Sequence, residues 1–93
     1  MTENEIVELG VRAQLLLTSE TFRKVVSHLG DQYANLILTS APNEGDKRED
    51  GYHQHRALND IVTQLNLYVG QKDQILEQRK MAEQEEEPLD EDA

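Results

Sequence analysis

The chain has 93 residues, no cysteine and no tryptophan, and a formal net charge of −10. This length allows one small domain, and the absence of cysteine excludes disulfide bonds, thiolate zinc sites and cysteine nucleophiles. Residues 83–92 include seven acidic residues and no basic one, which leaves twelve acidic and nine basic residues elsewhere, a net charge of −3. Because phosphate binding needs clustered Lys and Arg, we expect no direct binding to nucleic acid.

The first predicted helix covers residues 3–17. Thr2 and Glu5 have the spacing of a capping box, in which each residue bonds the backbone of the other. Gly10 lies inside this helix, where it is compatible either with close approach of another helix or with no structural role. The apolar residues of this segment fall on one side at helical spacing: Ile6, Leu9, Ala13, Leu16 and Leu17.

The second predicted helix covers residues 19–39. Thr18 is a suitable N-cap, and Leu17 and Phe22 occupy the two positions of a hydrophobic staple around it. The boundary has no spare residues for a reversal of the chain, so we expect a kink there. The stripe of this helix continues in phase across Gly30: Phe22, Val25, Val26, Leu29, Tyr33, Leu36 and Ile37.

The third predicted helix covers residues 46–82 and follows a turn at residues 40–45, which contain Pro42 and Gly45. Asp46 and Glu49 match a second capping box. Lys72 interrupts the apolar stripe, which is compatible with a polar residue that fixes the register or with a lysine that extends to the edge. The stripe consists of Tyr52, Leu58, Ile61, Val62, Leu65, Tyr68, Val69, Ile75 and Leu76.

These segments predict an all-α fold. Residues 3–39 and 46–82 are equally long, and a fold about the intervening turn pairs positions whose numbers sum to about 85, so that apolar positions meet along both arms. We therefore predict a long antiparallel helical hairpin with a kinked first arm over residues 1–82. The alternative is a three-helix bundle. Residues 83–93 are expected to form a disordered acidic tail, and the thin aliphatic core favours a homo-oligomer.

No motif for catalysis or cofactor binding is present. His53 and His55 are two residues apart and diverge on a helix, and His28 lies on another helix, so we expect no metal site. Paired carboxylates need a concave pocket, which a hairpin does not provide. We expect a protein that is not an enzyme, holds no cofactor and does not cross a membrane, since the longest apolar runs have only three residues.

Two sets of residues are candidates for contact with a partner protein. The first set is apolar and belongs to the predicted helices: Phe22, Leu29, Tyr33, Tyr52, Leu58, Leu65, Val69 and Leu76. The second set belongs to the acidic tail, which is either functional or only solubilising: Glu85, Glu86, Glu87, Asp90, Glu91 and Asp92.

Residues 40–75 resemble small helical proteins encoded by tailed bacteriophages. The similar features are a short turn, an Arg-Glu pair, an aromatic residue, an Arg-Ala-Leu triplet and a leucine stripe, and here they include Arg48, Glu49, Tyr52, Arg56, Ala57 and Leu58. The resemblance extends over about residues 8–76 and implies a phage setting, in the host cytoplasm or the virion, among genes for the head and DNA packaging. It implies no activity and no site.

Composition, stripes and resemblance together favour a non-enzymatic phage protein that acts through helix-mediated contacts between proteins. The expected setting is virion head assembly or DNA packaging, with a structural or packaging component as partner. The alternative is an acidic inhibitor that mimics DNA and blocks a nucleic-acid-binding protein of the host.

Overall fold

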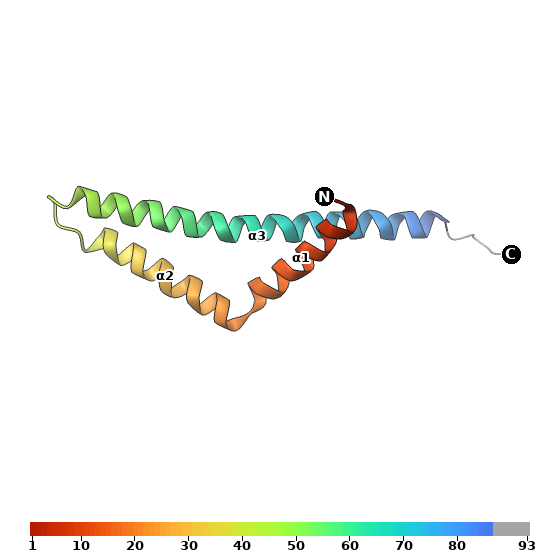
Figure 1. Cartoon of the computed structure of the whole chain (residues 1–93), viewed down its shortest axis with the longest axis horizontal. Helices are drawn as coiled ribbons and strands as arrows, with labels where there is room; N and C mark the ends of the chain where they lie inside the picture. Colours follow the sequence, from red (N-terminus) through yellow and green to blue (C-terminus); the bar gives the residue numbers. More distant parts are fainter. Residues whose placement is uncertain (87–93) are drawn as a thin grey trace.

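The computed structural model describes residues 1–86, which form three α-helices joined by short connections (Figure 1). Helix α1 spans Glu3–Thr18, α2 spans Glu20–Leu38 and α3 spans Gly45–Glu86. The molecule measures 78 × 23 × 22 Å, and its radius of gyration is 21.1 Å, whereas a compact domain of this length has a radius of about 12 Å. The predicted all-α hairpin is confirmed.

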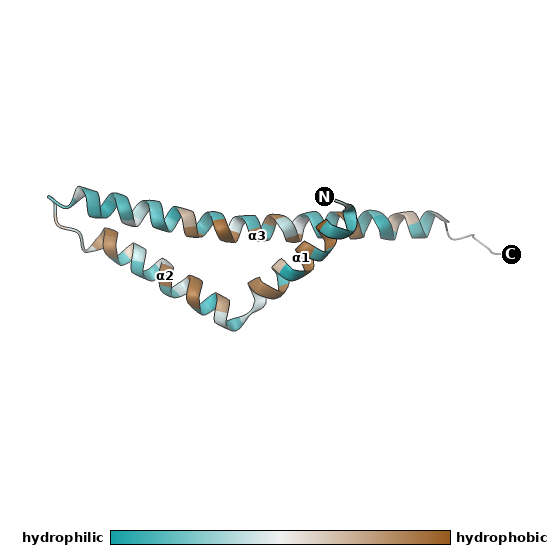
Figure 2. Ribbon diagram, viewed as in Figure 1, coloured by the Kyte–Doolittle hydropathy of each residue, from teal (hydrophilic) through white to brown (hydrophobic). Residues whose placement is uncertain are grey.

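Helices α1 and α2 follow one another along α3 and pack on it, and they make little contact with each other. Figure 1 shows that the bend between them is the point at which the first arm stands furthest from α3. Hydrophobic residues gather on α1 and in the middle of α3, whereas the first turns of α3 are hydrophilic (Figure 2). The long helix therefore supports two shorter helices that lie one after the other along it.

The start of α1 is fixed locally, as the sequence predicts. The Thr2 side chain accepts a hydrogen bond from the Glu5 backbone N–H at 3.1 Å, and the Glu5 carboxylate accepts one from the Thr2 backbone N–H at 2.9 Å. This capping box satisfies two N–H groups that the first turn of a helix leaves free.

The bend differs by one residue from the prediction, because Ser19 and not Thr18 is the N-cap of α2. Ser19 has extended backbone, and its Oγ accepts a hydrogen bond from the Phe22 N–H at 3.3 Å. The Thr18 hydroxyl donates instead to the carbonyl of Gln14 at 2.9 Å. This bond keeps Thr18 in the last turn of α1, so α1 runs one residue further than expected.

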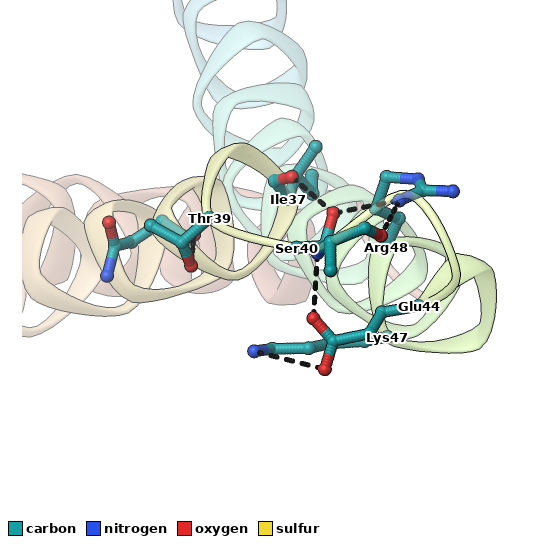
Figure 3. Close-up of polar contacts among 8 residues, drawn as sticks. Ile37, Thr39, Ser40, Glu44, Lys47 and Arg48 are labelled. Carbon is teal, nitrogen blue, oxygen red and sulfur yellow. Dashed lines mark hydrogen bonds and ion pairs between the residues drawn. The ribbon is translucent and has the colours of Figure 1, made fainter.

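The turn between α2 and α3 is held by side chains that bond back to it (Figure 3). Arg48 donates to the carbonyl of Ala41 at 2.7 Å and to the Ser40 Oγ at 3.1 Å. The Ser40 hydroxyl donates to the carbonyl of Ile37 at 2.8 Å, and the Glu44 carboxylate accepts from the Ala41 N–H at 2.7 Å. The first turn of α3 is thereby fixed to the end of α2.

Helix α3 is longer than predicted at both ends. It begins at Gly45, so Asp46 lies inside its first turn and the predicted capping box at Asp46 and Glu49 does not begin the helix. Glu44, the residue before it, is engaged in the turn. At the other end α3 continues through residues 83–86, because this stretch has good helix-forming residues and precedes the proline at position 88. Residues 87–93 of the predicted tail lie outside the described residues.

Candidate interaction surface

The buried row of α3 repeats every seven residues. Its members are separated by alternating steps of four and three, and each is buried or partly buried: Gly51, His55, Leu58, Val62, Leu65, Val69 and Lys72. Such a 4-3 repeat is typical of helices that pack at a shallow angle as in coiled coils. The facing rows have the same spacing on α2 (Ser19, Phe22, Val26, Leu29, Tyr33 and Leu36) and on α1 (Ile6, Gly10, Ala13 and Leu17). We call these facing rows the seam.

The register of the seam agrees with the predicted sum of 85. A Cβ built on Gly51 would lie 3.3 Å from Leu36 Cβ, a pair that sums to 87. Near the other end, Arg79 of α3 donates a 2.9 Å hydrogen bond to Asn4 of α1, a pair that sums to 83. Both arms therefore pair within about three residues of the expected positions, since Gly10 also lies against Lys72 and Gly30 near Leu58.

Six of the eight apolar contact residues predicted from the sequence lie partly buried in the seam: Phe22, Leu29, Tyr33, Leu58, Leu65 and Val69. The other two, Tyr52 and Leu76, are exposed. In this arrangement the six hold α3 to the shorter helices. Their contact with another chain stays a prediction.

Two glycines bring the helices together at the two ends of the molecule. On α1, a Cβ added to Gly10 would lie 2.7 Å from the carbonyl oxygen of Tyr68 on α3. On α3, a Cβ added to Gly51 would lie 3.2 Å from the carbonyl oxygen of Tyr33 on α2. Of the two explanations for Gly10, close helix approach is the correct one. The equivalent role of Gly51 depends on the facing helix and cannot be recognised from residues near it in the chain.

Lys72 is buried opposite the tightest helix contact. Its side chain is only 9% exposed, and its Nζ donates to the Gln14 Oε1 on α1 and lies 3.1 Å from the Asp73 carboxylate. The lysine side chain therefore does not extend into solvent but forms a hydrogen bond with Gln14 of α1. Because Gln14 and Asp73 lie on the same side of the seam, the polar interaction is confined to that side.

A shallow apolar groove lies where the first arm bends away from α3. It encloses about 290 Å³ and is lined by Leu17, Phe22, Val26 and Val62, with Arg23 and Ser27 at its edge. Leu17 and Phe22 were predicted as a hydrophobic staple around Thr18. Because Ser19 is the N-cap, they do not occupy the staple positions, and both line this groove. The groove contains no carboxylate, so its chemistry is that of apolar contact.

The described part of the chain has little buried apolar surface. Ala13, 3% exposed, is the only hydrophobic residue classed as fully buried over residues 1–86. The accessible surface is 7188 Å², whereas a compact 10.7 kDa monomer exposes about 5,500 Å². Several large apolar side chains are left exposed on all three helices: Val11, Leu15, Leu16, Val25, Leu38, Tyr52, Ile61, Leu67, Leu76 and Met81.

The middle of α3 is almost free of charge on all sides. From residue 57 to residue 71 the only charged residue is Asp60, although 30% of the chain is charged. Ile61 and Leu67 in this stretch are 55% and 51% exposed. Leu67 was not among the predicted contact residues, because it lies outside the apolar stripe. The absence of charge around it is the sequence signal that could have identified it.

Ionisable side chains in the described residues have mainly local partners. His53 lies 3.8 Å from Glu49, and His55 lies 3.3 Å from Asn59. No group of three potential metal-ligating side chains was found within residues 1–86. The pKa of Glu5 is lowered by the hydrogen bond from the Thr2 backbone and, second, by that from the Thr2 side chain. Of the predicted acidic set, Glu85 is exposed at the end of α3, and Glu87, Asp90, Glu91 and Asp92 lie outside the described residues.

No protein-family model, curated protein or solved structure matches this chain. None of the helices within residues 1–86 combines the length and the apolar character that crossing a membrane would require. The surface described above therefore has to be interpreted from its own geometry.

Proposed function

We propose that the protein acts without catalysis, through helix-mediated contacts with another protein, in virion head assembly or DNA packaging. The observation that supports contact is the exposed apolar surface of α3, above all Leu67, which lies outside the seam and is 51% exposed. Large apolar side chains on a stretch with one charge in fifteen residues are more typical of an interface than of a solvated helix.

The proposed setting is supported by the resemblance of residues 40–75 to small helical proteins of tailed phages. Arg48, which belongs to the similar segment, fixes the turn that aligns the two arms. A rod of 78 Å with exposed apolar residues along its length is suited to bridge the surfaces of larger partners.

The test is recovery of partners with the tagged, full-length protein from phage-infected cells. We expect head or packaging proteins to be recovered, and Leu67→Glu to reduce their recovery roughly tenfold, because a buried leucine contributes about 1.5–3 kcal/mol. Gln74→Glu is the matched control, since it adds the same charge one heptad further along the same exposed row. Equal recovery with both variants, or partners unrelated to the virion, would contradict the proposal.

The acidic inhibitor is distinguished by the tail. Glu83 to Glu85 are exposed at the end of α3, and the acidic residues continue beyond the described residues. An inhibitor that mimics DNA requires this charge, so deletion of residues 83–93 would abolish binding to a basic host protein. For a contact protein that uses α3, the same deletion leaves partner recovery intact while Leu67→Glu lowers it.

A further inference from the structure

One side of α3, next to the seam, has no charged residue and combines an apolar row with a row rich in glutamine. Ile61, Tyr68 and Ile75 are one heptad apart on this side, and the neighbouring row consists of Ala57, Gln64, Gln71 and Gln78. We call these seven residues the uncharged flank. They fall within one sector of about 100° on the helix, and none of them is fully buried by α1 or α2.

The opposite side of the seam is mainly polar. Its row on α3 consists of Tyr52, Asn59, Asn66, Asp73 and Lys80, all exposed. Lys72 directs its ammonium group to this side, where Gln14 and Asp73 bind it. The hairpin thus has one mainly polar side and one uncharged side, on which Ile61 is exposed and Tyr68 and Ile75 are half-buried. A two-helix hairpin needs only the seam positions, so the additional apolar row predicts another helix against the flank.

We propose that a second copy of this chain covers the uncharged flank, with the two α3 helices antiparallel and a two-fold axis close to Tyr68. The flank does not include Leu67, so this inference goes beyond the contact proposed above and does not depend on it.

The spacing of the flank is self-complementary in this arrangement. A two-fold axis near Tyr68 places Ile61 opposite Ile75 of the second copy, and Gln64 opposite Gln71. Glutamine side chains both donate and accept hydrogen bonds, so they can pair with glutamine across a two-fold axis. Apolar residues of the shorter helices are also arranged about this axis. In the register of 85, Leu16 faces residue 69, close to the axis. Leu9 and Val25 lie at similar distances on either side of it.

Charge also favours this side for self-association. Two chains with a net charge of −10 repel one another, and pairing is least opposed where no charged residue enters the contact.

The test uses single cysteines, since the native chain has none. Under mild oxidation Tyr68→Cys is expected to cross-link to itself. Gln64→Cys and Gln71→Cys are each expected to cross-link poorly alone but readily when mixed, because like positions lie about 10 Å apart along the helix while a disulfide needs Cα atoms within about 7 Å. Thr63→Cys, exposed and away from the flank, is the control and should not cross-link.

A second experiment compares two variants with the same change in charge. Ile61→Glu places a carboxylate in the flank, and Thr63→Glu places one two residues away and outside it. We expect the dimer dissociation constant, measured by sedimentation equilibrium, to rise at least about tenfold for Ile61→Glu and to change little for Thr63→Glu. Added salt should strengthen the native dimer, because it screens repulsion between the two chains.

Two results would overturn the inference. Self-cross-linking of Gln64→Cys and of Gln71→Cys, each alone, would show parallel pairing, and a mass of one chain at every concentration would show a monomer. Either result leaves the proposed function standing if Leu67→Glu still lowers recovery of head proteins. Conversely, a dimer with the predicted cross-links that recovers no virion protein would remove the proposed function and keep the dimer.

Discussion

Gly10 of α1 lies directly against Lys72 of α3, so closely that a Cβ on the glycine would meet the Cβ of the lysine. The same position lies 2.7 Å from the carbonyl oxygen of Tyr68, which is backbone and cannot move aside as a side chain can. The close approach of α1 to α3 therefore depends on the absence of a side chain at this position.

Gly10→Ala is expected to destabilise the protein despite the better helix propensity of alanine. The propensity gain is at most about 1 kcal/mol, whereas overpacking against backbone costs about 1–3 kcal/mol. Gly70→Ala is the matched control, because a Cβ there meets nothing within 4 Å, and it should stabilise the protein by up to ~1 kcal/mol. Urea unfolding of both variants measures the difference, and stabilisation by Gly10→Ala would contradict the close contact.

We expect Lys72 to stabilise the helix contact mainly through its buried stem. Lys72→Met keeps a long apolar side chain and removes the buried ammonium, so we expect a change in unfolding free energy within about 1 kcal/mol. Lys72→Ala leaves a cavity next to Gly10 and is expected to cost about 1–3 kcal/mol. Equal losses in the two variants would show that the hydrogen bond to Gln14, and not packing, holds the helices at this point.

The cap at the bend gives a third prediction. Ser19→Ala removes the side-chain acceptor for the Phe22 N–H and is expected to cost about 1 kcal/mol. Thr18→Ala removes only a bond to the carbonyl of the preceding turn and should change stability by less than ~0.5 kcal/mol. Calorimetry of thermal unfolding compares the two variants. A larger loss of stability for Thr18→Ala would show that Thr18, and not Ser19, caps α2.

The capping box at Thr2 and Glu5 makes stability depend on acid pH. Because the pKa of Glu5 is lower in the folded chain than its ordinary value of 4.5, the stabilisation is present above pH 4.5 and is lost as the pH falls through the folded pKa. An NMR titration of the Glu5 carboxyl should give a pKa below 4.5. Thr2→Val should return it toward 4.5, since it removes the hydroxyl. An unchanged pKa in that variant would show that the backbone bond acts alone.

Features that depend on neighbouring residues alone were predictable from the sequence. The capping box at Thr2, the kink near residue 18 and the register of about 85 follow from local spacing and from the equal lengths of the two arms. The cap at the bend was placed one residue early, because a threonine can either cap the next helix or bond its own. The capping box predicted at Asp46 and Glu49 does not begin α3, because the bonds of Glu44 and Arg48 hold the turn before it.

Features that depend on the facing helix could not be derived in the same way. From the sequence alone, Gly51 is only a residue of low helix propensity. The backbone of α2 opposite it explains why a glycine is needed there. Lys72 was recognised as an interruption of the stripe, but its bond to Gln14 requires the register of both helices. The uncharged flank lies beside the stripe and not on it, so a search for apolar periodicity overlooks its glutamines.

Helices α1 and α2 lie end to end along α3 and do not pack side by side with each other. The most direct test is the distance between spin labels at Glu8 and Asp31, which are exposed on α1 and α2, measured in the full-length protein diluted with unlabelled chain. The hairpin predicts a separation of about 30 Å, from 23 residues at 1.5 Å per residue shortened by the bend. A separation near 10 Å, the spacing of neighbouring helices in a bundle, would contradict it.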